Sequence, residues 1–173
     1  MALFRKRIGL ADARAKLLAI VIGSPEKDAD LARSYPQAVS STAVITELLT
    51  VRLFGVLVAC KETHHGDWRG AGRELFESIQ EPVVAALAAV REEPPVLVER
   101  ALGDQLQYYG LAAGVISEPS MDALGREVGE SFRMVLREEP DDALSRLGRG
   151  TFFMALDRTI AFQNDHKLAQ GYA

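Results

Sequence analysis

The sequence contains a single cysteine, Cys60, so no disulfide can form within the chain. Disulfides are typical of secreted domains and rare in proteins of reducing compartments. With 173 residues, 48% of them hydrophobic, the chain can bury a core that needs neither a disulfide nor a metal. We therefore expect a cytoplasmic protein rather than a secreted disulfide scaffold.

Sequence features that bind phosphate are also missing. The glycine-containing segment at residues 70–72 lacks the lysine and the spacing of a P-loop. The net charge is −4, and since residues 1–16 carry +4, the rest of the chain totals −8. Affinity for nucleic acid comes mainly from Lys and Arg side chains that neutralise phosphates. An acidic body therefore makes nucleic acid an unlikely partner.

The apolar segments are interrupted by charges, which disfavours a secretory signal or a membrane span. Residues 9–22 contain charges of both signs, and no small-residue cleavage site follows them. The longest apolar stretch, residues 42–60, contains Glu47 and Arg52. Each of these charges costs roughly 2.5–3.5 kcal/mol near the centre of a bilayer. We interpret this stretch as part of a central core helix over residues 41–66.

Apolar residues recur at helical spacing in every long segment, and no segment shows sustained alternation. This pattern predicts an all-α protein, a compact bundle of about six helices in a single domain over residues 1–173. The expected parts are N-terminal helices in 1–36, the core helix in 41–66, a first helical hairpin in 70–117 and a second in 120–166.

The first helix is expected from Phe4 to Ile22. Its predicted apolar face steps by three and four residues through Ile8, Ala11, Ala15 and Leu18. Ser24 and Pro25 then predict the start of a short second helix, because serine is favoured as an N-cap and proline at the first helical position.

The two expected hairpins resemble each other in sequence. Residues 72–79 read like residues 125–132, and the Arg-Glu-Glu-Pro of residues 91–94 recurs letter for letter at 137–140. The order of the two matches favours an internal duplication that gave two related hairpins. In the first copy we expect Pro82 to break the helix into two pieces, because proline removes a helical hydrogen bond.

The densest polar cluster spans residues 60–69. Glu62 and His65 are three residues apart and share a helical face, the Glu-x-x-His spacing of di-iron bundles, although the motif occurs only once. One alternative function is therefore a transition-metal or haem site with Glu62, His64, His65 and His166 as ligands. In the other interpretation, which we favour, the histidines complement the dipole of a helix that ends before Gly66.

The basic N-terminal segment suggests a further alternative. Its cations accompany an apolar stripe, as in helices that lie on anionic membrane surfaces; they are Arg5, Lys6, Arg7, Arg14 and Lys16. The same pattern also fits an amphipathic helix that docks on the core and leaves its charges in water. We favour docking, with a membrane surface as the alternative partner.

No complete catalytic constellation emerges from the sequence. Cys60 lies in the most apolar helix, where a free cysteine usually behaves as a small buried hydrophobe rather than a nucleophile. The preferred interpretation is therefore a non-enzymatic interaction or assembly protein that associates with itself or with a protein partner and needs no cofactor. The candidate contact residues are aromatic: Trp68, Tyr108, Tyr109, Phe152 and Phe153.

Overall fold

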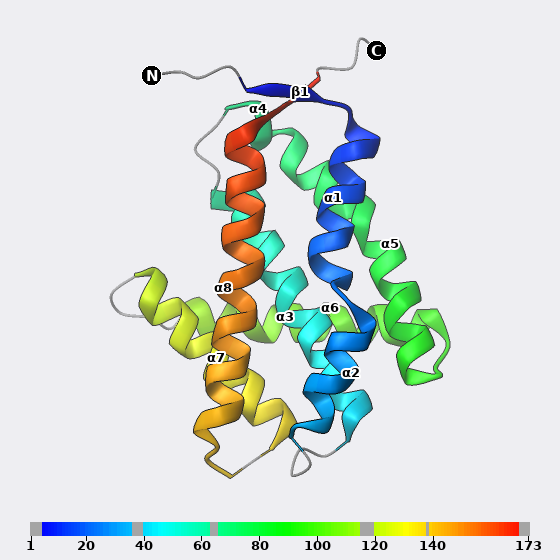
Figure 1. The fold of residues 1–173 in the computed structure, drawn as a ribbon, viewed down its shortest axis with the longest axis vertical. Coiled ribbons are helices and arrows are strands. Elements are labelled where there is room, and N and C mark those ends of the chain that lie inside the picture. Colours follow the sequence, from blue (N-terminus) through cyan, green and yellow to red (C-terminus); the bar gives the residue numbers. More distant parts are fainter. Residues whose placement is uncertain (1–4, 36–39, 63–65, 115–119, 138, 170–173) are drawn as a thin grey trace.

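A computed structural model describes residues 5–35, 40–62, 66–114, 120–137 and 139–169 of the chain. Over these ranges seven helices of nine residues or more form an all-α bundle, as the periodicity predicts (Figure 1). They are α1 (Leu10–Ile22), α2 (Pro25–Arg33), α3 (Ser41–Glu62), α5 (Ala71–Arg91), α6 (Pro95–Gly114), α7 (Met121–Leu136) and α8 (Asp142–Asp165). A short helix, α4 (Gly66–Arg69), and two strands, β1 (Lys6–Ile8) and β2 (His166–Leu168), complete the described structure.

Helix α3 lies at the centre of the bundle and divides the core into two parts. One part packs α3 against α1, α4, α5 and α6, and the other packs it against α2, α6, α7 and α8. By length and composition α3 could cross a membrane, but 78% of its most apolar window is buried inside the protein. Its apolar residues point in every direction because neighbours surround it, which explains why it lacks a polar face.

Several predicted helix boundaries are confirmed. Pro25 is the first residue of α2 and follows Ser24, whose backbone is extended. At the start of α8, the Asp141 Oδ1 accepts hydrogen bonds from the backbone N–H groups of Ala143 and Leu144, at 2.9 and 3.1 Å. The inner face of α8 buries Phe152, Ala155, Leu156 and Thr159.

The prediction for the first helix is wrong in its start and in its face. The helix begins at Leu10, and Phe4 lies outside the described residues. Residues 6–8 form β1, which pairs in parallel with β2 near the end of the chain. The buried face is Ala13, Leu17 and Val21, whereas Ala11 and Ala15 are exposed. Pairing between residues so distant in sequence leaves no trace in local periodicity. The periodicity alone therefore places the start of this helix too early in the chain.

The expected break at Pro82 is also wrong, because α5 continues through the proline. Ile79 and Val83, on either side of it, are fully buried on one apolar stripe of the helix. Proline in a helix interior costs roughly 3 kcal/mol. Burial of large aliphatic side chains, at roughly 1.5–3 kcal/mol each, offsets that cost as long as the stripe stays in register.

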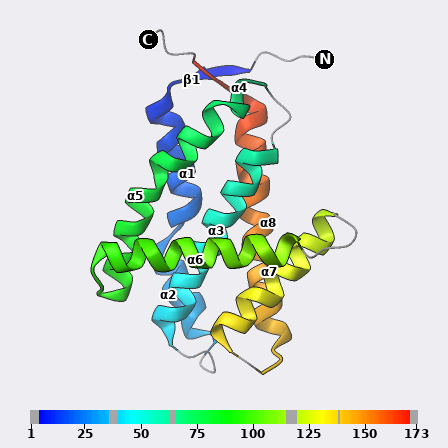
Figure 2. The same cartoon turned by 180° about the vertical axis from the view of Figure 1, so that it is seen from behind.

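The structure does not confirm that the two hairpins are related. Helix α6 crosses the outside of α3 and α5, whereas α8 runs along α7 and α3 (Figure 2). The identical tetrapeptides also differ in conformation. Arg91 is the last residue of α5, and the next residue has a φ of 55°, while Arg137 follows α7 in an extended conformation with a φ of −160°. The internal duplication stays a prediction from the sequence.

Candidate functional site

Of the four proposed metal ligands, the structure describes only Glu62 and His166. His64 and His65 lie outside the described residues, and Glu62 is exposed at the end of α3. The ring of His166 packs against the ring of Phe162 in a tilted arrangement, with centroids 4.8 Å apart, and its Nδ1 lies 2.9 Å from the Phe162 carbonyl oxygen. No group of three or more His, Cys, Asp or Glu residues that could hold a metal occurs in the described part of the chain. The metal or haem site therefore stays an untested prediction.

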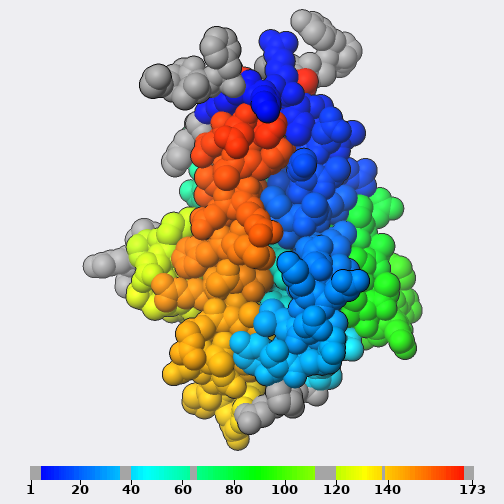
Figure 3. All heavy atoms as spheres, in the orientation of Figure 1, coloured from blue at the N-terminus to red at the C-terminus, as the bar shows by residue number. Residues whose placement is uncertain are grey.

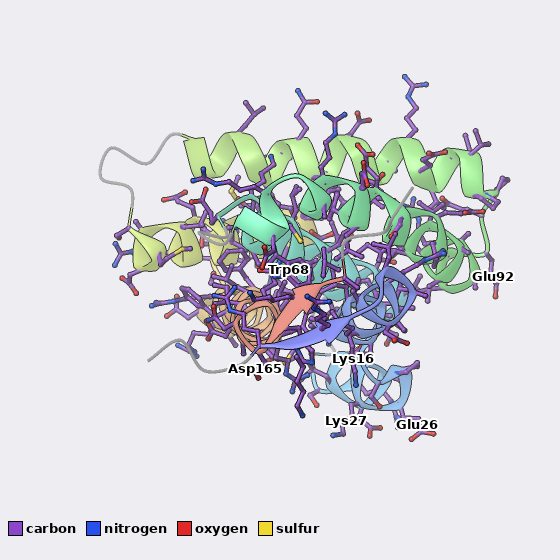
Figure 4. All side chains as sticks on the ribbon, turned by 90° about the horizontal axis from the view of Figure 1, so that it is seen from above. Lys16, Glu26, Lys27, Trp68, Glu92 and Asp165 are labelled. Atoms are coloured by element: carbon purple, nitrogen blue, oxygen red, sulfur yellow. The ribbon has the colours of Figure 1, made fainter. Side chains whose placement is uncertain are left out.

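Three of the five aromatic contact candidates belong to the core. Trp68, Tyr109 and Phe152 are fully buried, and Trp68 lies among the helices in Figure 4. This corrects the expectation that they meet a partner, because their rings are covered by other parts of the same chain. Phe153 is half-buried, and only Tyr108 is exposed, at 38%.

The basic N-terminal segment adopts the docked arrangement. Lys6, Arg7 and Lys16 are exposed, and Arg5 and Arg14 are half-buried. The apolar face of α1 is buried in the core that α1 shares with α3 and α5. Attachment to a membrane through this face would require α1 to leave the bundle.

Cys60 occupies a position that suits packing rather than chemistry. It is 6% exposed in the core, and Gln163 Nε2 donates a hydrogen bond to its Sγ at 3.7 Å. Burial raises the pKa of the Cys60 thiol to about 11. The nucleophilic thiolate is therefore scarce at neutral pH, as expected for a buried cysteine that packs as a hydrophobe.

Exposed large apolar residues gather on helix α6. Among the described residues eight such side chains are exposed, and α6 supplies four of them: Val96, Leu97, Tyr108 and Leu111. Helix α6 is the outermost element on its side of the molecule (Figures 2 and 4), whereas the opposite face is formed by α1, α2 and α8 (Figure 3). Of these four residues only Tyr108 is among the contact candidates predicted from the sequence, although α6 has more apolar residues than one buried stripe can use.

A second cluster surrounds Glu47, which α3 carries into the interior. Its side chain is only 1% exposed. Two donors from α6 reach the carboxylate: Tyr109 Oη donates to one oxygen, and Gln105 Nε2 donates to the other at 2.5 Å. No described Lys, Arg or His lies within ion-pair distance of Glu47. From the sequence alone, the charge of Glu47 only disfavours a membrane span.

Burial controls the proton affinity of this cluster. Desolvation raises the pKa of Glu47 to about 7, although the hydrogen bonds from Tyr109 and Gln105 oppose the rise. Burial, together with the neighbouring Glu47 carboxylate, raises the pKa of Tyr109 well above its ordinary value. Glu47 therefore changes its charge near neutral pH, while Tyr109 stays a neutral hydrogen-bond donor.

Comparisons with protein families, with curated proteins and with solved structures find no match to this chain. Function therefore has to be inferred from features of the chain itself.

Proposed function

We propose that this protein is a non-enzymatic assembly protein that dimerises with a second copy of itself through the exposed side of α6. The supporting observation is the set of large apolar side chains that α6 leaves in contact with water, including Val96 at 69% and Leu111 at 63% exposure. Large apolar side chains exposed at both ends of one outer helix favour a site of protein association. Burying them against another molecule removes their unfavourable contact with water.

The order of residues along α6 favours a second copy as the partner. Val96, Arg100, Asp104 and Tyr108 are four residues apart, so they form one exposed ridge along the helix. The ridge reads apolar, positive, negative, apolar, so reversing its direction keeps the apolar ends in place and exchanges the signs of the two central charges. In a two-fold symmetric interface residue i contacts residue j, and j contacts i. Two antiparallel α6 helices would therefore pair Arg100 with the partner's Asp104 twice.

The same arrangement covers the apolar ends of the ridge. Val96 would meet the partner's Tyr108, and the symmetric contact would form at the other end. Gly103 lies beside the centre, and apart from the backbone of α6 and the two chain neighbours no atom lies within 4 Å of the place where a Cβ would stand. The bare backbone at Gly103 would let the two helices approach closely at the proposed axis.

Light scattering coupled to size-exclusion chromatography tests the proposal. We expect a dimer for the unmodified chain and a monomer for Val96→Glu, because that change places two carboxylates in the apolar contacts. Val96 lies in the first turn of α6, where an acidic residue suits the helix dipole, so the fold should persist. Leu10→Glu is the matched control, since Leu10 begins α1 and is 51% exposed away from α6. It should stay dimeric.

Exchange of the two charges tests the antiparallel register. In Arg100→Glu the new carboxylate would lie against the partner's Asp104. In Asp104→Arg the new guanidinium would lie against the partner's Arg100. Each variant should therefore dimerise weakly, because like charges meet in both contacts. An equimolar mixture of the two variants should form a heterodimer with two attractive pairs. Mixing leaves the change within each chain in place, so recovery would report the contact between chains. A strictly monomeric unmodified protein would contradict the proposed function, and a mixture that fails to recover would contradict the register.

A further inference from the structure

An open groove of about 530 Å³ lies between the C-terminal part of α3 and the adjoining helices α4 and α5. Helix α3 lines it with Leu57, Cys60 and Lys61, and from Arg69 to Gln80 the lining residues of α4 and α5 recur at spacings of three and four. Side chains at these spacings share one face of a helix, so two helix faces look onto the same space. The volume is typical of small-molecule sites, which span about 300–1,000 Å³.

The base of the groove is apolar. Phe76 and Cys60 are each 6% exposed, and Leu57 is half-buried. Helix α5 approaches α3 closely at the buried Gly72, where a Cβ would lie 3.0 Å from the Cys60 carbonyl oxygen. The two helices therefore meet at the base, and the small apolar area that they leave open suits a short alkyl chain.

The rim of the groove is positively charged. Lys61, Arg69 and Arg73 all line the groove and are exposed. Arg73 Nε donates to Glu77 Oε1 at 2.8 Å, and because both residues line the groove this pair lies on its wall without net charge. Neither Lys61 nor Arg69 has an ion-pair partner among the described residues.

Two uncompensated cations therefore share one groove in a chain whose net charge is −4. Of the described residues that line the groove, Glu77 is the one acid, and its charge is already matched by Arg73. An added anion would be attracted to the rim and an added cation repelled. Charge and apolar area thus occur side by side, as an amphiphilic anion requires.

We propose that this groove binds a small carboxylate with a short alkyl chain. The carboxylate accepts charge-assisted hydrogen bonds from the Arg69 guanidinium and the Lys61 ammonium group. The alkyl chain lies against Leu57 and Phe76 at the base. The site is independent of the proposed dimer, because its described lining residues belong to α3, α4 and α5 and not to α6.

Titration of the ¹⁵N-labelled full chain with hexanoate, followed by NMR, tests the site. Hexanol and hexylammonium are the matched probes, because they keep the alkyl chain and change the charge of the head group. We expect saturable shifts in residues 57–61 and 69–80 with hexanoate. Hexanol should bind about fivefold more weakly, since it makes no ion pair, and hexylammonium should produce no saturable shifts.

The length of the alkyl chain tests the apolar base. Butyrate should bind about tenfold more weakly than hexanoate, because each CH₂ that is buried contributes roughly a factor of three to four. Equal binding of the two acids would mean that they only pair with surface cations, and it would contradict the proposed groove.

Variants assign the head group to the two cations. The double variant Lys61→Met/Arg69→Met should weaken hexanoate binding about fivefold or more and leave hexanol binding unchanged, because methionine keeps the apolar part of the side chain. Lys27→Met is the matched control, since Lys27 is an exposed cation on α2 and does not line the groove. It should bind hexanoate as the unmodified protein does.

Salt dependence gives a readout that needs no variant. Raising NaCl from about 20 mM to about 200 mM should weaken hexanoate binding and leave hexanol binding unchanged, because salt screens exposed charges. Hexanol that binds as tightly as hexanoate, undiminished binding in the folded double variant, or no saturable shift with hexanoate would each overturn the proposal. Light scattering measures the dimer separately, so none of these results would bear on the proposed function.

Discussion

Two acidic side chains are buried against helix α3, and the protein compensates their burial in different ways. Asp28 of α2 is 3% exposed, and both of its oxygens accept hydrogen bonds from the Arg52 guanidinium at 2.6 Å. Glu47 is 1% exposed and is bonded only by Tyr109 and Gln105 among the described residues. One site cancels a charge with another charge, and the other supplies only neutral donors.

The Asp28–Arg52 pair is therefore a structural contact, whereas the Glu47 carboxylate can still gain or lose a proton. The Asp28–Arg52 pair joins α2 to α3 and uses both oxygens of its carboxylate in a bidentate contact. At Glu47, burial without a cation raises the pKa to about 7, so a modest change in pH or an added cation alters its charge. The comparison therefore identifies Glu47, not Asp28, as the buried acid that changes its charge near neutral pH.

The largest expected effect comes from breaking the ion pair. Arg52→Met should lower the free energy of unfolding by about 3–5 kcal/mol, because it leaves Asp28 buried without a counter-charge. Urea denaturation followed by circular dichroism measures the change. The double variant Asp28→Leu/Arg52→Met should recover most of the loss, since it removes both charges. A loss below about 1 kcal/mol in Arg52→Met would mean that Asp28 escapes to water, as for an exposed pair.

Replacing Glu47, which has no cationic partner among the described residues, should raise the free energy of unfolding. Because the pKa of Glu47 is about 7 in the folded protein and 4.5 as its ordinary value, the folded state holds the proton more tightly. Stability from this group is complete below pH 4.5, falls as pH rises to about 7, and is then constant. Glu47→Gln should therefore match the unmodified protein near pH 4.5 and exceed it by about 3 kcal/mol at pH 8.

The pH dependence of the difference between the two proteins is the decisive measurement. Urea titrations of both proteins at several pH values cancel the contributions of all other groups. A difference that stays constant from pH 4.5 to 8 would show that Glu47 is already ionised throughout, and the contrast with Asp28 would disappear.

Removing one hydrogen-bond donor to Glu47 should change the free energy of unfolding less. Tyr109→Phe should cost about 2 kcal/mol at pH 8, because the ionised carboxylate loses a hydrogen bond in the interior. The pKa of Glu47 should then rise above 7, since the bond from Tyr109 lowers it. Tyr108→Phe is the control, because the Tyr108 hydroxyl contacts only the Met134 sulfur, at 3.9 Å, among its described neighbours. An NMR titration of the Glu47 side chain and urea denaturation measure both effects.

The sequence predicted those features of the fold that depend on local pattern. The all-α class and the start of α2 at Pro25 both follow from spacing and capping preferences. The features it missed depend on distant partners. The β1–β2 pairing joins residues 6–8 to residues 166–168, and the continuous α5 depends on core packing on either side of Pro82.

The candidate sites show the same limit. A glutamate in an apolar helix could be noticed, but its neutral donors come from α6, some sixty residues away, so its proton affinity could not be foreseen. Trp68, Tyr109 and Phe152 were misjudged for a related reason, since composition does not tell an exposed aromatic ring from a buried one. The surplus of apolar residues on α6 could be predicted, because the sequence of this helix contains more of them than a single buried face can hold.

The smallest expected effect concerns the two threonines beside the acid. Thr46 Oγ1 has no partner, whereas Thr50 Oγ1 bonds to a backbone carbonyl, although both hydroxyls are buried in the same helix. The exchange of Thr for Val keeps the shape and removes only the hydroxyl, so it isolates the hydrogen bond. Thr46→Val should be more stable than Thr50→Val by about 1 kcal/mol, because only the second change breaks a bond. Equal stabilities in urea would mean that Thr46 Oγ1 already has a hydrogen-bond partner, such as a water molecule.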